Sequence, residues 1–345
     1  MAASRNENGF AGRTILVTGG AGAIGSNLTR VLAKGGARLV IVLDDFSSSR
    51  AWNVPSLPNV LLVEGSVLDE IALKRVFNEG IDYVFHLAAF FANQNSVDYP
   101  ERDLAVNGLG ILKVLEYARL CGVERFVYSS SGCAIYPPDA PLPLTEETIT
   151  LKLGSPYQIT KMLGELYCNY FHAQYGLKVV KARFFNSFGP GEVPGRYRNV
   201  IPNFIYWALK GEPLPITGSG KETRDFTYVG DIVRGLLAAA GTESAVGESF
   251  NLGSGEETRV IDLAEMINRK TGNPAGIRHL PRRRWDHKER LLASIEKAGS
   301  LIGYRPATSF EDGIDATIAW FREHWDKIEA AADFPPGLSP ALNTG

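Results

Sequence analysis

One short segment near the N-terminus restricts the possible folds more than any other. Residues 14–18 (TILVT) form an apolar, β-branched run that stops at the glycine-rich turn GGAGAIG. After this turn the apolar residues fall on one helical face, at Ile24, Leu28, Val31 and Leu32. A buried strand, a glycine turn and an amphipathic helix in this order predict the first unit of a doubly wound parallel sheet.

Strand and helix patterns alternate through the rest of the N-terminal half. Apolar strand patterns lie at residues 38–43, 60–63, 83–87 and 125–128, and helical patterns lie at 70–79, 101–121 and 156–175. Because parallel strands need crossover connections, this alternation predicts an α/β fold with a Rossmann-type doubly wound parallel sheet.

The composition is that of an ordinary globular chain. The 345 residues are 45% hydrophobic and 21% charged with a formal net charge of −2, so we expect neither nucleic acid nor a membrane surface as partner. No apolar run approaches the roughly 20 residues of a membrane span, and the first residues carry no apolar signal core. Cys121, Cys133 and Cys168 form no CxxC pair, so we expect no disulfide framework and no metal site, and we predict a cytoplasmic location.

The glycine turn is also the first chemical signal. Gly19, Gly22 and Gly25 leave backbone amides and the positive end of a helix open to a pyrophosphate. Asp44 follows Gly25 by 19 residues, at the end of the second predicted strand, where a carboxylate can accept hydrogen bonds from an adenosine ribose. Because this carboxylate also repels a 2′-phosphate, the pattern predicts NAD rather than NADP as cofactor.

Later motifs follow in a recognisable order. From about Arg13 to about Phe321, the chain resembles the extended short-chain dehydrogenases/reductases that modify nucleotide sugars, in particular UDP-galactose and UDP-glucuronate 4-epimerases. The motifs that carry the resemblance are TGGAGAIGS, HLAA, SPYQITK with its YxxxK signature, RFFNSFGPGE, TRDFTYVGDI and FNLGSGE.

The resemblance implies two domains and a set of cofactor contacts. Residues 1–186 would form the NAD-binding Rossmann domain, to which 226–253 return, and 187–345 would form a smaller α/β lobe for the substrate, with a loosely ordered tail from about 331. The predicted cofactor contacts are Gly19, Gly22, Ala23, Ile24, Gly25, Asp44, Ser66, Val67, Leu87, Ala88, Ala89, Asn107, Tyr157 and Lys161.

The YxxxK signature supplies the predicted base. Tyr157 and Lys161 are four residues apart in a helical pattern, so they project from one helix face. A free tyrosine titrates near pH 10, and a neighbouring ammonium and a nicotinamide cation would have to lower the pKa by about 3, which corresponds to about 4 kcal/mol. Tyr157 can then remove a proton from a sugar hydroxyl while hydride passes to NAD⁺.

The segment YSSSGCAIYPP supplies the third predicted catalytic residue. In the family, the strand before the tyrosine helix ends in a hydroxyl residue that binds the reacting sugar oxygen. This chain has one residue more than the family's SSSATVYG text, and we predict Ser131 for this role, with Ser130 as the alternative and a bulge near Gly132. Cys133 resembles the catalytic cysteine of GDP-mannose 3,5-epimerases, whereas no carboxylate follows as in 4,6-dehydratases or UDP-glucuronate decarboxylases.

The resemblance places further residues at a nucleotide sugar. Asn186, Arg224 and Arg283, the middle residue of a triple arginine, would bind its diphosphate, because a guanidinium fork matches phosphate oxygens. The complete set of predicted substrate contacts is Ser96, Ser131, Asn186, Asn199, Val200, Arg224 and Arg283, with residues 214–217 near the nucleotide base.

These patterns together predict an NAD-dependent nucleotide-sugar 4-epimerase with a UDP-sugar as the favoured substrate. A 3,5-epimerase that uses Cys133, a decarboxylase, a 4,6-dehydratase and a non-catalytic NAD-sensing or scaffold protein remain as alternatives. The helix expected at 103–118 is apolar on several faces, so we also predict a homodimer in which it packs beside the helix of Tyr157.

Overall fold

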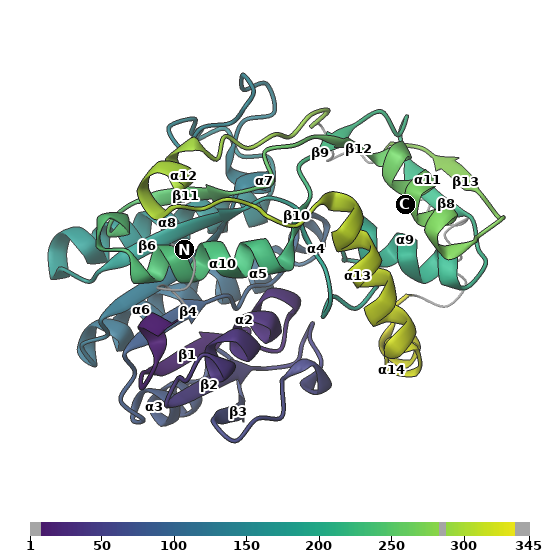
Figure 1. Ribbon diagram of the computed structural model, residues 1–345. Coiled ribbons are helices and arrows are strands. Elements are labelled where there is room, and N and C mark those ends of the chain that lie inside the picture. The colour runs from purple at the N-terminus through teal and green to yellow at the C-terminus, as the bar shows by residue number, and fades with distance from the viewer. Residues whose placement is uncertain (1–7, 283–287, 335–345) are drawn as a thin grey trace.

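The structure is a computed structural model that describes residues 8–282 and 288–334. Its centre is a seven-stranded sheet in which every neighbouring pair of strands is parallel (Figure 1). In spatial order the strands are β11 (Ser249–Leu252), β6 (Val179–Phe184), β5 (Arg125–Ser131), β4 (Tyr83–His86), β1 (Thr14–Thr18), β2 (Leu39–Asp44) and β3 (Val60–Glu64). The predicted doubly wound sheet is therefore confirmed.

The two faces of the sheet bury separate hydrophobic clusters. One cluster joins the sheet to α2 (Ala23–Lys34), α10 (Val229–Gly241) and α12 (Glu296–Ile302), and the first two of these helices lie side by side in front of the sheet in Figure 1. The other cluster joins it to α3 (Glu70–Phe77), α6 (Ile111–Leu120) and α8 (Pro156–Tyr175). Since both faces are covered, β1 is buried along its whole length, as its continuous apolar run predicts.

Two local elements differ from the sequence prediction. The helical pattern at 101–121 is not one helix but α5 (Pro100–Asp103), a π-helical segment η3 (Leu104–Gly110) and α6. Strand β5 continues three residues past its predicted end, and a short helix, α7 (Gly132–Ile135), begins immediately after it. The bulge predicted near Gly132 is therefore wrong, and a helical turn takes up the additional residue.

The remaining elements connect the sheet or build the smaller lobe. The shorter elements are α4 (Asn93–Asp98), η1 (Asn8–Phe10), η2 (Ala51–Asn53) and η4 (Glu243–Ala245). The lobe contains three two-stranded pairs, β7 (Ser187–Phe188) with β10 (Thr227–Tyr228), β9 (Thr223–Arg224) with β12 (Thr258–Arg259), and β8 (Leu214–Thr217) with β13 (Ile277–Leu280). Its helices are α9 (Val200–Leu209), α11 (Val260–Thr271), α13 (Phe310–Glu323) and α14 (Trp325–Ala331), which share a third hydrophobic cluster.

Late segments of the chain return to the sheet. Strand β11 pairs with β6, and α10 packs on the sheet, both within the range predicted to return. Helix α12 and Tyr304 also pack there, beyond that range. The tail expected to be loose from about residue 331 is packed as far as Phe334, because the ring of Phe334 lies 4.7 Å from that of Trp207. The rest of the tail lies outside the described residues.

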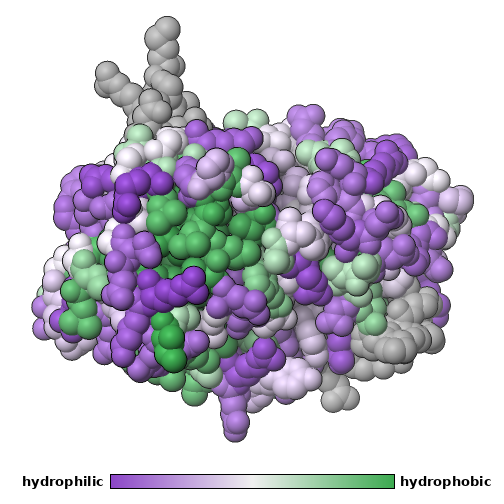
Figure 2. Space-filling view, turned by 90° about the horizontal axis from the view of Figure 1, so that it is seen from below, coloured by the Kyte–Doolittle hydropathy of each residue, from purple (hydrophilic) through white to green (hydrophobic). Residues whose placement is uncertain are grey.

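The face that Figure 2 shows is mostly hydrophilic. The face seen from below in Figure 1 carries the β2 and β3 end of the sheet, and Figure 2 shows one compact hydrophobic area there among hydrophilic residues. In the part of the chain that the structure describes, none of the helices combines the length and apolar character of a membrane span.

Candidate active site

A cavity of about 540 Å³ runs past the carboxyl ends of the sheet strands and into the lobe. Its walls include the glycine turn after β1, the end of β2, the last residues of β5 and the first turn of α8. Ligands of doubly wound folds bind at this edge of the sheet, because strands and helix N-termini meet there. The cavity is therefore the candidate active site.

The glycine turn fits a pyrophosphate closely. Gly19 has a φ of 68°, and a Cβ on it would lie 2.7 Å from the backbone nitrogen of Ala88. A Cβ on Gly25 would lie 2.4 Å from the carbonyl oxygen of Gly19. Both positions are therefore restricted to glycine, and the turn brings its backbone amides to the start of α2, where an anion is favoured.

Asp44 lies at the end of β2 on the wall of the same cavity. Its Oδ2 accepts a hydrogen bond from the backbone nitrogen of Ala21 at 2.9 Å, and its Oδ1 accepts from the Ser49 hydroxyl at 2.6 Å and from the Phe46 nitrogen at 3.0 Å. Since each carboxylate oxygen can accept about two hydrogen bonds, Oδ2 keeps capacity for a ribose hydroxyl. The backbone amides of the turn, which can donate to a pyrophosphate, and the Asp44 carboxylate, which can accept from a ribose, thus fit NAD.

Most other predicted cofactor residues also line the cavity. These are Gly22, Ala23, Ile24, Ser66, Val67, Leu87, Ala88, Ala89, Tyr157 and Lys161. Asn107 does not line it. Its side chain accepts a hydrogen bond from the Phe90 nitrogen at 2.8 Å and donates one to Asp103 at 2.8 Å. Asn107 therefore holds the segment after β4 in place without lining the cavity itself.

The three predicted catalytic residues meet in the middle of the cavity. Ser131 ends β5, Tyr157 lies in the first turn of α8, and both residues line the cavity. Lys161 follows one turn later, with its Nζ 5.6 Å from the Tyr157 ring centroid and 2.8 Å from the carbonyl oxygen of Ser129, to which it donates. The helical spacing predicted from YxxxK is the one observed.

Burial dominates the ionisation of this group. It raises the pKa of Tyr157 above its usual value, and the hydrogen bond from Ser131 acts in the opposite direction. Burial also lowers the pKa of Lys161 to about 8, while the nearby carboxylate of Asp103 raises it. Lys161 is still mostly protonated at neutral pH and provides a positive charge beside the phenol, but the protein alone does not turn Tyr157 into a base.

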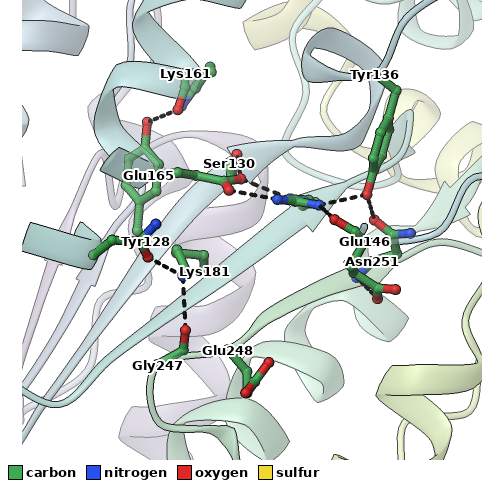
Figure 3. Close-up of polar contacts among 12 residues, drawn as sticks. Tyr128, Ser130, Tyr136, Glu146, Lys161, Glu165, Lys181, Gly247, Glu248 and Asn251 are labelled. Carbon is green, nitrogen blue, oxygen red and sulfur yellow. Dashed lines mark hydrogen bonds and ion pairs between the residues drawn. The ribbon is translucent and has the colours of Figure 1, made fainter. Parts of the chain in front are cut away.

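A buried polar network holds the neighbouring serine (Figure 3). Ser130 donates to Glu165 on α8 at 2.5 Å, and Glu165 forms an ion pair with Arg183 at 2.7 Å. Arg183 also donates to the hydroxyl of Tyr136 at 3.0 Å, and that hydroxyl donates to Asn251 at 2.5 Å. Since the hydroxyl of Ser130 is used in this network, the geometry favours Ser131 over Ser130 for substrate binding.

The two residues after Ser131 have different surroundings. A Cβ on Gly132 would lie 2.1 Å from the ring of Phe185, so a glycine is required for the chain to pass. Cys133 lines the cavity, and its sulfur accepts a hydrogen bond from the backbone nitrogen of Asn186 at 3.2 Å. Burial raises the pKa of the Cys133 thiol, and the charges of Lys288 and Arg224 reduce this effect. The thiol is therefore neutral at pH 7.

The predicted substrate residues divide into three groups. Asn186, Asn199, Val200 and Arg224 line the cavity with Ser131, as do residues 215–217. Ser96 does not: it is fully buried, and its hydroxyl accepts a hydrogen bond from the Tyr157 nitrogen at 3.1 Å, so it supports the start of α8. Arg283 lies outside the described residues.

Several wall residues carried no sequence signal. Among them are Gln94 and Asn95 after β4, Arg198 between β7 and α9, and Trp207 and Phe334 in the lobe. None of these belongs to a motif with a fixed spacing. Only its position next to the predicted contact Asn199 could have indicated from the sequence that Arg198 lines the cavity. Glu192, the last residue of the RFFNSFGPGE motif, also lines the cavity, although no role was predicted for it.

Comparison with known proteins agrees with this geometry. The sequence model of the NAD dependent epimerase/dehydratase family matches residues 15–253. A UDP-glucose 4-epimerase of Mycolicibacterium smegmatis is 34% identical over 313 residues, covering 89% of this chain and 98% of that protein. A UDP-N-acetyl-alpha-D-glucosaminuronate decarboxylase of Bacillus cytotoxicus is 32% identical, covering 89% and 97%. The solved structure of an epimerase from Methanothermobacter thermautotrophicus has a TM-score of 0.95 and 59% identity, covering 96% of this chain and 98% of that one.

The chain therefore belongs to the NAD dependent epimerase/dehydratase family. The family resemblance, the Rossmann-type fold and NAD as cofactor, all predicted from the sequence, are confirmed. The relatives include both epimerases and a decarboxylase, so membership alone leaves the individual reaction open.

Proposed function

We propose that this chain is a UDP-sugar 4-epimerase, which oxidises C4 of the sugar transiently and reduces it again from the opposite face. The observation that supports this most is the meeting of Ser131, Tyr157 and Lys161 at the centre of a cavity that begins at the NAD turn. Bound NAD supplies the acceptor and donor of hydride.

The chain's own residues would remove the proton of the sugar 4-hydroxyl and later return it. Ser131 holds the 4-hydroxyl of the sugar, and Tyr157 removes its proton. Burial raises the pKa of Tyr157, so the phenolate needs positive charge nearby. Lys161 supplies one such charge, with its Nζ 5.6 Å from the ring centroid of Tyr157. Tyr157 would return the proton when C4 is reduced, so the reaction would consume neither a net proton nor an external reductant.

Asn186 and Arg224 would hold the diphosphate while the 4-keto sugar turns. Arg224 lies on the cavity wall, and its Nη1 also donates to the carbonyl oxygen of Thr223 at 2.8 Å, which orients the guanidinium. A fixed diphosphate with a mobile sugar allows hydride to return to either face of C4. The names of the curated relatives support UDP as the nucleotide.

The rival reactions need groups that this site does not supply. Elimination in a 4,6-dehydratase and the further steps of a decarboxylase need an acid beside the serine, whereas α7 reads Gly-Cys-Ala-Ile. A 3,5-epimerase needs a base at C5, and burial raises the pKa of the Cys133 thiol. A neutral thiol is a poor base.

A homodimer is part of this proposal. Exposed apolar side chains lie on η3 and α8, where Leu104 is 55% and Leu166 is 54% exposed. Ile159, Leu166 and Tyr170 share one face of α8, and η3 packs beside it. A second copy that covers these helices would remove a large apolar surface from water. Light scattering of the Leu166→Arg variant should show monomers where the parent chain shows dimers, and a monomeric parent chain would refute the dimer.

A substrate panel in D₂O tests the reaction. The full chain is incubated with UDP- and GDP-sugars, and products are analysed by NMR and mass spectrometry. We expect UDP-sugars to give 4-epimers without deuterium on carbon. Deuterium at C3 and C5, loss of water or loss of carbon dioxide would instead identify a 3,5-epimerase, a dehydratase or a decarboxylase. No turnover by a chain that binds NAD would favour a sensing or scaffold role.

A further inference from the structure

The loop between β7 and α9 is fastened to the glycine-rich turn. Asn53 donates from its side-chain nitrogen to the carbonyl oxygens of Ala21 at 3.2 Å and Gly191 at 2.7 Å, which ties the loop to the turn. A Cβ on Gly191 would lie 3.2 Å from the Cα of Ala23, the first residue of α2. The loop therefore passes beside the helix end where a pyrophosphate is expected to bind.

This loop brings a buried carboxyl group into the cavity. Glu192 lines the cavity but is only 7% exposed, and its Oε1 accepts a hydrogen bond from the Asn199 side chain at 2.9 Å. Burial raises the pKa of Glu192 to about 7, against the lowering effect of the Arg198 charge. The carboxyl group is thus ionised in part of the molecules at neutral pH, and the positive charge of Arg198 favours its ionised form.

Arg198 lines the cavity with unused hydrogen-bonding capacity. Burial lowers its pKa, while the carboxylates of Glu192 and Asp333 raise it and the charge of Arg50 lowers it again. Across residues 8–282 and 288–334, its guanidinium forms no side-chain hydrogen bond or close ion pair. A guanidinium has five N–H donors, and partly burying it without acceptors is unfavourable. An anionic ligand in the cavity would remove this cost.

The C-terminal segment fixes the two loops that carry these arginines. The Arg50 side chain donates to the carbonyl oxygen of Ala331 at 2.9 Å. The backbone nitrogen of Arg196 donates to the carbonyl oxygen of Asp333 at 2.8 Å. Arg50 directly follows Ser49, which hydrogen-bonds the predicted ribose ligand Asp44. The surroundings of Arg198 therefore belong to the cofactor end of the cavity.

We infer that Arg198 binds the pyrophosphate of NAD from the side of the lobe, with Glu192 as its charge partner. The cofactor would then be held by backbone amides of the glycine turn and by a guanidinium from the loop before α9, so that both parts of the chain retain it. Charge-assisted hydrogen bonds to phosphate are stronger than neutral ones, and a guanidinium fork matches phosphate oxygens. The inference depends on NAD as cofactor and not on the position of the sugar that reacts.

The test measures binding rather than turnover. The dissociation constants of NAD⁺ and of UDP are measured by calorimetry on the full chain after removal of bound nucleotide, for Arg198→Gln and for the control Arg30→Gln. Arg30 is exposed on α2 and does not line the cavity, so its replacement makes the same change in charge elsewhere. We expect Arg198→Gln to weaken NAD⁺ binding by about 10- to 100-fold and to leave UDP binding unchanged, and Arg30→Gln to change neither.

Two further measurements locate the contact. Adenosine should bind the parent chain and Arg198→Gln equally, whereas ADP-ribose should bind the variant more weakly, because only ADP-ribose carries the pyrophosphate. If Arg198→Gln does not fold, Arg198→Lys keeps the charge without the fork, and its NAD⁺ affinity should fall by a smaller factor. Unchanged NAD⁺ affinity in the folded variant, or a loss confined to UDP, would overturn the inference.

Discussion

Replacing Glu192 by glutamine should remove a pH-dependent loss of stability from this protein. The folded chain holds the Glu192 proton more tightly than the unfolded chain, because burial raises its pKa from 4.5 to about 7. Between these values the unfolded state releases the proton first, so stability falls as the pH rises. A difference of about 2.5 between the two pKa values corresponds to a loss of about 3 kcal/mol once the pH exceeds 7.

The glutamine variant resembles the protonated side chain and keeps an oxygen for the Asn199 hydrogen bond. Its free energy of unfolding, measured in urea, should match that of the parent chain at pH 4 and exceed it by about 3 kcal/mol at pH 8. Because other groups titrate equally in both proteins, they cancel in the comparison. An equal difference between the two proteins at both pH values would refute the reasoning.

Glu222 provides a control of opposite sign. Burial raises its pKa, but hydrogen bonds from its own backbone and from Ser219 outweigh this effect and lower the pKa below its usual value. Its negative charge therefore stabilises the folded chain above the usual titration range and ceases to do so as the pH falls. Glu222→Gln should lose stability relative to the parent chain at pH 8 and lose less at low pH.

Three further predictions concern the site and its support. Tyr157→Phe should retain NAD in the purified protein but lower turnover by about 100-fold or more, as measured by product formation from a UDP-sugar. Gly25→Ala should abolish NAD⁺ binding in equilibrium dialysis, because the added Cβ would lie 2.4 Å from the carbonyl oxygen of Gly19. Arg183→Leu leaves Glu165 charged and unpaired in a buried site, so urea unfolding should show a loss of about 3–5 kcal/mol, and adding Glu165→Leu should recover part of it.

The sequence predicted the features that depend on local spacing. The glycine turn, the strand before it and the YxxxK helix all follow rules of short range, and the structure has each of them at the predicted residues. The position of Asp44 could be predicted because it is the last residue of β2, and the carboxyl ends of parallel strands face the ligand cavity.

The features that depend on distant residues could not be predicted. Gly132 starts a helical turn instead of a bulge, and the ring of Phe185, more than 50 residues away in the sequence, occupies the space that a Cβ at this position would need. Ser96 and Asn107 resemble ligand contacts in the sequence, but both use their polar groups on neighbouring backbone. Arg198 enters the site through a loop held by Asn53, and no spacing rule links these positions.

Transfer of a deuterium label tests the central proposal most directly. The chain is incubated with UDP-glucose that carries deuterium at C4, and the UDP-galactose formed is analysed by NMR. If C4 is oxidised and reduced by the same bound cofactor, the deuterium is found at C4 of the product with the configuration inverted. Loss of the label to solvent, or its retention in a product that differs elsewhere in the sugar, would contradict 4-epimerisation.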